Sequence, residues 1–178
     1  MTIFISGGCK NGKSTLAERC AAALAGEGPL YYIATMIPHD EEDRARIRRH
    51  VAARAGAGFE TIEQGTDLPA VLEKADASGS FLLDSVTALL SNEMFPGPDF
   101  DPEAGRRVAE DLAAFAKGVK NAVFVSDFLY ADAGRYDEYT ECYRRGLALC
   151  DKTLAACCDT AVEVFSGNWL VYKGEVPV

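Results

Sequence analysis

The chain has 178 residues, of which 48% are hydrophobic and 25% are charged, and this fits one globular domain spanning residues 1–178. Its formal net charge of −9 argues against a nucleic-acid partner, because binding to a phosphate backbone requires a basic face. No apolar run is long enough for a membrane span and no signal segment is recognisable, which predicts a cytoplasmic protein. The six cysteines show no metal-binding spacing and are expected to be free thiols.

The first motif lies between an apolar strand-like segment and an apolar helical segment. Its sequence, SGGCKNGKST at residues 6–15, contains Gly7-x-x-x-x-Gly12-Lys13-Ser14, the spacing of a phosphate-binding loop. In such loops backbone N–H groups surround the phosphates, the lysine reaches the β- and γ-phosphates, and the serine hydroxyl binds Mg²⁺. The motif therefore predicts a nucleoside triphosphate and Mg²⁺ as ligands, with the Lys13 ammonium on the solvent side of the loop.

Apolar strand-like segments recur along the chain, and helical patterns separate most of them. They lie at residues 2–6, 30–34, 59–63, 80–84, 121–126, 161–166 and 169–173. Strands that alternate with helices indicate an α/β fold with a mainly parallel sheet covered by helices on both faces. The last two segments are separated only by Gly167 and Asn168, a pair typical of hairpin turns, so the sheet is expected to end in an antiparallel C-terminal edge.

A second element of the phosphate site is expected at the end of another buried strand, because a carboxylate has to organise the magnesium ion. Asp84 ends the segment FLLD, and Asp127 ends the equally apolar segment VFVSD. Asp84 could instead act only as the N-cap of the helix that follows it, a position that aspartate favours. The phosphate-loop pattern favours the metal role for Asp84, and the sequence leaves both aspartates as candidates.

An unusually basic helix is predicted over residues 41–54, with Asp40 as its N-cap and acidic residues in its first turn. Arg46, His50 and Arg54 are four residues apart and share one face of this helix. Two flanking guanidinium groups disfavour protonation of the imidazole, and a neutral imidazole has the lone pair that a nucleophile needs. Taken alone, a charge run of this kind is more often a solvated surface.

These elements, in this order, resemble the bifunctional adenosylcobinamide kinase and adenosylcobinamide-phosphate guanylyltransferase family of cobalamin biosynthesis. The matching segments are FISGGCKNGKS at residues 4–14, YYIAT at 31–35, RIRRH at 46–50, ETIE at 60–63 and LLDSVTALLSN at 82–92. The phosphate loop is shared with many kinases, whereas the combination of segments is much more specific. The match covers mainly the first half of the chain.

The resemblance implies a RecA-like P-loop NTPase fold, a homotrimer and two reactions. ATP or GTP would phosphorylate the aminopropanol hydroxyl of the corrinoid adenosylcobinamide; GTP would then guanylylate His50, and the GMP would pass to cobinamide phosphate. His50 and Lys13 are thus the candidate catalytic residues, and Ser14 and Asp84 the candidate Mg²⁺ ligands. The candidate nucleotide-binding residues are Gly7, Gly8, Cys9, Lys10, Asn11, Gly12, Lys13, Ser14, Ala34, Thr35, Met36, Val51, Ala52, Ala53, Arg54, Glu63 and Asp84.

The second half of the chain departs from the family pattern. The segment SDFLYADAGRYDEY at residues 126–139 stands where the family usually has an Asn-Glu-Val-Gly segment, and Leu149 and Asp151 stand at the positions of a family arginine and asparagine. Two other functions therefore stay open: a small-molecule P-loop kinase without the guanylyl step, and a non-catalytic regulator that binds nucleotide without consuming it. The sequence shows no preference between ATP and GTP.

Overall fold

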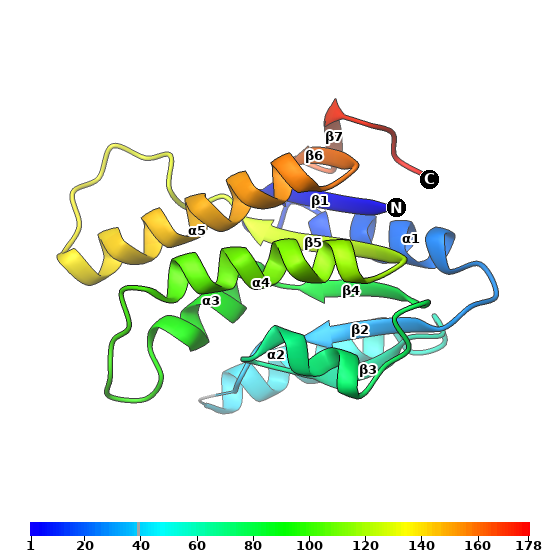
Figure 1. The fold of residues 1–178 in the computed structure, drawn as a ribbon, viewed down its shortest axis with the longest axis horizontal. Helices are drawn as coiled ribbons and strands as arrows, with labels where there is room; N and C mark the ends of the chain where they lie inside the picture. The colour runs from blue at the N-terminus through cyan, green and yellow to red at the C-terminus, as the bar shows by residue number, and fades with distance from the viewer. Residues whose placement is uncertain (39) are drawn as a thin grey trace.

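The computed structural model describes residues 1–38 and 40–178, apart from the side chains of Arg46, His50 and Ala53. Within this part of the chain seven strands form one sheet with the order β3-β2-β4-β5-β1-β6-β7 (Figure 1). They are β1 (Thr2–Gly7), β2 (Leu30–Ala34), β3 (Glu60–Glu63), β4 (Ser80–Asp84), β5 (Asn121–Asp127), β6 (Thr160–Phe165) and β7 (Asn168–Lys173). Neighbouring strands pair in parallel except β6 and β7, which are antiparallel, so the predicted sheet and its edge are confirmed.

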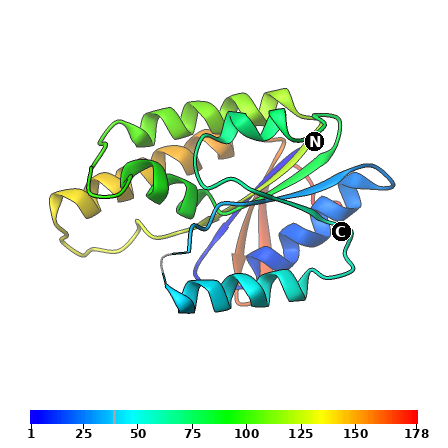
Figure 2. The ribbon, with the colours of Figure 1, turned by 90° about the horizontal axis from the view of Figure 1, so that it is seen from below.

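The helices lie on both faces of the sheet, as Figures 1 and 2 show. One face carries α1 (Lys13–Ala25) and α2 (Glu41–Ala53); the other carries η1 (Leu68–Glu73), α3 (Val86–Met94), α4 (Ala104–Gly118) and α5 (Glu138–Cys157). None of the helices in the described residues combines the length and the apolar character needed to cross a bilayer. The six cysteines are free thiols, as predicted.

Each face of the sheet has its own hydrophobic core, and β2 contributes to both. Tyr31 belongs to the core beneath α3, α4 and α5, whereas Tyr32 belongs to the core beneath α1. Neighbouring residues face opposite ways because successive side chains on a strand alternate between the two faces. This alternation places Tyr32 on the side of the sheet where α1 and α2 lie.

The central strands bring the two candidate carboxylates to the end of the sheet where the phosphate loop begins. Strands β1, β4 and β5 are buried along almost their whole length, which is typical of parallel strands covered on both faces. In the register of the sheet Gly7 pairs with Asp127, and Ala34 pairs with Asp84. Both aspartates therefore lie at the carboxyl edge, where ligands of open α/β sheets bind.

Two local predictions can be compared directly with the structure. Asp40 is confirmed as the N-cap of α2, because its Oδ1 accepts a hydrogen bond from the Asp43 N–H at 2.8 Å. The hairpin turn between β6 and β7 is shifted by one residue, to Ser166 and Gly167, so Asn168 already belongs to β7. Ser166 and Gly167 have φ angles of 49° and 78°, and two positive angles are what a two-residue type I′ turn requires.

Candidate active site

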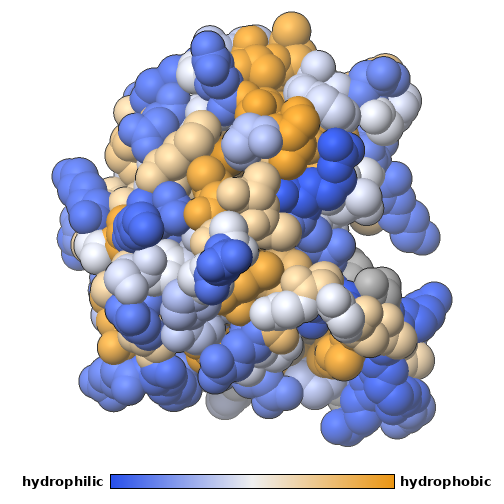
Figure 3. Space-filling model, turned by 90° about the vertical axis from the view of Figure 1, so that its right-hand side faces the viewer, coloured by the Kyte–Doolittle hydropathy of each residue, from blue (hydrophilic) through white to orange (hydrophobic). Residues whose placement is uncertain are grey.

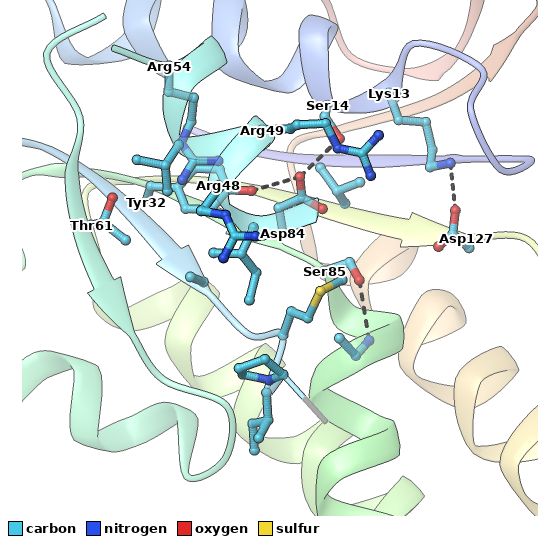
Figure 4. Close-up of a pocket in the computed structure, with 18 of the residues that line it drawn as sticks. Lys13, Ser14, Tyr32, Arg48, Arg49, Arg54, Thr61, Asp84, Ser85 and Asp127 are labelled. Atoms are coloured by element: carbon cyan, nitrogen blue, oxygen red, sulfur yellow. Dashed lines mark hydrogen bonds and ion pairs between the residues drawn. The ribbon is translucent and has the colours of Figure 1, made fainter. Parts of the chain in front are cut away.

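A cavity of about 1020 Å³ opens at the carboxyl edge of the sheet. The phosphate loop with the start of α1 lines one side of it, and α2 lines the other (Figure 4). The space-filling view in Figure 3, taken from the opposite edge of the sheet, shows a notch at its right, on the side that carries α1 and α2. The volume is that of a small-molecule site, and the two motifs singled out in the sequence line the same space.

The phosphate loop needs glycine at two positions for different reasons. A Cβ atom at Gly7 would overlap the carbonyl oxygen of Val164 on β6, so only glycine allows the close approach of these strands. Gly12 has a φ of 94°, in the left-handed region that favours glycine, and it is the N-cap of α1. The first N–H groups of α1 thus lie at the cavity, where the N-terminal end of the helix favours a bound anion.

Lys13, the first residue of α1, lies at the cavity but is only 6% exposed. Its Nζ donates to the carbonyl oxygen of Gly8 at 2.6 Å and to Oδ1 of Asp127 at 2.8 Å. The expectation that this ammonium faces solvent is therefore wrong. The physical reason is that a buried charge needs a partner, and Asp127 at the end of the neighbouring strand supplies it.

Asp84 is held by hydroxyl groups instead of a cation. Its Oδ2 accepts hydrogen bonds from Ser14 Oγ at 2.9 Å and from the Tyr32 hydroxyl at 3.0 Å. The alternative that Asp84 caps the next helix is wrong, because Ser85 is the N-cap of α3 and its hydroxyl accepts from the Ala88 N–H. Serine precedes that helix by one residue, so its oxygen reaches the free N–H groups.

Ser14 and Asp84 together fit Mg²⁺, since hydroxyl and carboxylate oxygens are the hard ligands this ion prefers. Among the described residues, no group of three or more His, Cys, Asp and Glu side chains is placed to hold a metal ion. A Mg²⁺ ion that binds together with phosphates needs only one or two carboxylates. The pairing of Ser14 with Asp84, and of Lys13 with Asp127, favours Asp84 for the metal.

The α2 side of the cavity is lined by basic side chains. Arg48 and Arg49 point into the cavity in Figure 4, as does Arg54 directly after the helix. The face predicted from the spacing of Arg46, His50 and Arg54 does not include Arg48 and Arg49, although all five belong to one charge run. The side chains of Arg46 and His50 lie outside the described residues; the backbone at position 50 is one helical turn before Arg54.

Arg54 is buried, and it packs against an aromatic ring that was not predicted as part of the site. Its guanidinium carbon lies 3.4 Å from the centre of the Tyr32 ring, a close cation–π contact. Burial raises the pKa of Tyr32 well above its usual value, and the nearby Asp84 carboxylate raises it further, so the phenol stays a hydrogen-bond donor. The position of Tyr32 in YYIAT, two residues before the end of a strand, is the sequence signal that could have identified it.

Most of the predicted nucleotide-binding residues line the cavity. These are Cys9, Lys10, Asn11, Gly12, Lys13, Ser14, Ala34, Met36, Val51, Arg54, Glu63 and Asp84. Gly7, Gly8, Thr35 and Ala52 are not among the described lining residues, and the Ala53 side chain lies outside the description. Thr35 is fully buried, and its hydroxyl donates to the Ser85 carbonyl oxygen at 2.8 Å and accepts from the Ser85 N–H at 2.7 Å. Thr35 thus connects β2 to the start of α3.

Residues 3–171 match the model of a protein family described as cobinamide kinase / cobinamide phosphate guanyltransferase. The chain belongs to this family. It is 33% identical over 127 residues to the bifunctional adenosylcobalamin biosynthesis protein CobU of Salmonella typhimurium. These aligned residues make up 69% of this chain and 64% of the relative. The chain is 41% identical over 95 residues to the bifunctional protein CobP of Pseudomonas aeruginosa, 52% of each chain. The chain therefore spans only about half to two thirds of the length of these relatives.

The fold of this cobinamide kinase / guanyltransferase family member is shared more widely. The KaiC-like protein PH0186 from the archaeon Pyrococcus horikoshii superposes with a TM-score of 0.51 over 98% of this chain and 79% of its own. At 13% sequence identity this likeness concerns the fold alone. The RecA-like P-loop NTPase fold that the resemblance implied is confirmed by this likeness and by the order of the sheet.

Proposed function

We propose that this chain phosphorylates the aminopropanol hydroxyl of adenosylcobinamide with ATP or GTP, and then transfers GMP from GTP to the product through a covalent histidine–GMP intermediate on His50. The observation that carries the proposal is that a phosphate loop and an arginine-rich helix, which contains residue 50, line one cavity. Membership of the family, and the names of the bifunctional relatives, support both activities.

In the kinase step the phosphate-loop side would do the work. The N–H groups at the start of α1 would bind phosphate oxygens, and the Lys13 ammonium would stabilise the negative charge on the transferred γ-phosphoryl group. Asp127 would keep that ammonium in place through its contact with Nζ. Mg²⁺, for which Ser14 and Asp84 are the fitting ligands, would neutralise phosphate charge when bound.

In the guanylyl step the α2 side would act on a further molecule of GTP bound in the same cavity. A ring nitrogen of His50 would attack the α-phosphorus of GTP; the N–P bond forms while the bond to the bridging oxygen breaks, and pyrophosphate leaves. A phosphate oxygen of cobinamide phosphate would then attack this phosphorus and release the imidazole. Arg48 and Arg49 line the cavity and have the planar donor geometry that binds phosphate oxygens.

The test is to incubate the protein with GTP and Mg²⁺ and to measure its intact mass under neutral conditions, because a phosphoramidate is labile in acid. We expect one added GMP in the wild type and in His39→Asn, which changes the chain's other histidine, and none in His50→Asn. An adduct that persists in His50→Asn would place the nucleophile elsewhere. Phosphorylation of the corrinoid without any adduct would favour the simple kinase, and nucleotide binding without turnover would favour the regulator.

We also propose that the chain forms the homotrimer that the family resemblance implies. The support is an uncovered apolar edge of the sheet: Trp169, Leu170, Val171 and Tyr172 on β7 are all exposed. Hydrophobic side chains gather at the top of the face in Figure 3, the side where β6 and β7 lie in Figure 1. A contiguous apolar patch on an edge strand is typical of an association surface. A single-chain mass in light scattering would contradict this proposal.

A further inference from the structure

The Tyr32 side chain contacts both sides of the cavity. It comes from β2, it is buried, and it packs edge-on against Phe59 with 6.0 Å between the ring centres. Its hydroxyl faces Asp84 on the phosphate-loop side, and its ring faces Arg54 at the end of α2 (Figure 4). One rigid side chain therefore touches one charged group from each side.

The hydroxyl of Tyr32 fixes the orientation of the Asp84 carboxylate. Both hydrogen bonds found for this carboxylate in the described part of the chain, from Tyr32 and from Ser14, go to the same oxygen, Oδ2. Two donors on one oxygen define the rotation of the carboxylate group. The phenol thereby acts on the predicted metal ligand from outside the phosphate loop.

The ring of Tyr32 packs against the guanidinium group of Arg54, one nitrogen of which lacks a hydrogen bond among the described residues. Nη1 of Arg54 is buried, and among the residues that the structure describes it has no hydrogen-bond partner. A buried N–H group without a partner costs free energy, and a phosphate oxygen would satisfy it. Burial raises the pKa of Glu18 on α1, and the nearby charge of Arg54 partly opposes this shift.

We propose that Tyr32 is a positioning residue that presents Arg54 to a phosphate group of the nucleotide while it orients Asp84, so that the two sides of the cavity bind one triphosphate together. The part that concerns the guanylyl step rests on the proposed function above. The kinase step needs mainly the phosphate-loop side, whereas the guanylyl step needs both. Loss of the ring should therefore reduce the guanylyl step more than the kinase step.

The first test is a double-mutant cycle on GTP affinity with Tyr32→Leu and Arg54→Met, measured by calorimetry. Tyr32→Leu removes the ring, and Arg54→Met removes the charge at similar length. We expect each to weaken binding and the two effects to be non-additive by about fivefold or more, because residues in contact couple. Additive effects would overturn the proposal. This test needs no covalent adduct, so it decides the role of Tyr32 even if the proposed function fails.

The second test separates the ring from the hydroxyl and compares the two reactions. Tyr32→Phe keeps the ring, so we expect it to restore the rate of GMP adduct formation that Tyr32→Leu loses, while more Mg²⁺ is needed for half-maximal binding. Tyr31→Phe is the matched control: the Tyr31 hydroxyl accepts from the Asp76 N–H on the opposite face, and its loss should change neither rate.

The ratio of the two rates distinguishes positioning from a general loss of stability. We expect Tyr32→Leu to lower the adduct rate about tenfold more than the kinase rate, a ratio that partial unfolding would not change. Equal losses of both rates in Tyr32→Leu, or equal adduct loss in Tyr32→Phe and Tyr32→Leu, would contradict the proposed role of the ring. A wild type that forms no adduct would instead contradict the proposed function.

Discussion

The two sides of the cavity contain ion pairs of similar length in different surroundings. Lys13 lies 2.8 Å from Asp127, with side chains 6% and 27% exposed, whereas Arg48 lies 2.7 Å from Glu41, with side chains 63% and 74% exposed. Water and salt screen the second pair strongly, so it contributes little, while the first is largely shielded from solvent. The phosphate-loop side therefore has a charge held in a fixed place, and the α2 side has charges that a ligand can engage at little cost.

The largest effect that this comparison predicts is for removal of the buried charge. Lys13→Ala should reduce phosphoryl transfer by about 10²–10³-fold, because a preorganised cation near developing phosphate charge lowers the barrier by several kcal/mol. Arg48→Ala removes the same charge from the α2 side and should slow this step by less than about tenfold, in the range of a weak exposed interaction.

Kinase turnover of both variants, with circular dichroism to check the fold, measures this difference. An equal loss of kinase turnover in Arg48→Ala and Lys13→Ala would contradict the predicted difference between the two sides of the cavity. Normal turnover by a folded Lys13→Ala protein would remove Lys13 from the site altogether.

A smaller and more selective effect is expected for the two carboxylates at the edge of the sheet. Asp84→Asn removes the charged partner of Ser14 and should raise the Mg²⁺ concentration for half-maximal nucleotide binding by about tenfold. Asp127→Asn should change this concentration by less than about twofold and lower turnover instead, because it releases the Lys13 ammonium. Titration of nucleotide binding with Mg²⁺ in both variants gives the answer, and a shift in Asp127→Asn alone would assign the metal to the other strand.

The sequence was sufficient to predict the parallel sheet, the antiparallel edge and the phosphate loop, since each depends on local patterns. Glycine spacing, apolar runs and strand–helix alternation are all read within a few residues of one another. The ion pair between Lys13 and Asp127 was not predicted, because it depends on the order of strands in the sheet, which places β5 beside β1. The choice between Asp84 and Asp127 stayed open in the sequence for the same reason.

The contact between Tyr32 and Arg54 shows the same limit on the α2 side of the cavity. Helical periodicity grouped Arg54 with His50, and Arg54 lines the cavity, but periodicity cannot tell which side chain of another element lies beneath it. That depends on how α2 crosses the sheet and on which face of β2 Tyr32 occupies. Arg48 and Arg49 were missed because a charge run gives no preferred face until the helix has been packed against a neighbour.

Asp151 on α5 extends the comparison to a buried carboxyl group without a cation. It is 3% exposed, the Tyr130 hydroxyl donates to its Oδ2 at 3.0 Å, and no ion pair to it is found in the described residues. Burial raises its pKa from 3.8 to about 6; the hydrogen bond from Tyr130 opposes this shift, and the charge of Asp127 adds to it. Asp127, by contrast, has Lys13 beside it.

The Asp151 carboxylate is therefore expected to lower the stability of the folded protein at neutral pH. Because the folded-state pKa of Asp151 is raised, the folded protein holds this proton more tightly, and the free energy of unfolding falls as the pH rises from 3.8 through about 6. Asp151→Asn introduces the amide implied by the family resemblance, and this side chain stays neutral at every pH. The free energy of unfolding of the variant should exceed that of the wild type by roughly 1–3 kcal/mol at pH 7.5. Below the pKa of aspartate in the unfolded chain the two proteins should differ little. Urea denaturation of both proteins across this pH range measures the difference. An equal gain at every pH would mean that the amide acts through packing or hydrogen bonding, because only the cost of a buried charge disappears when the carboxyl group is protonated.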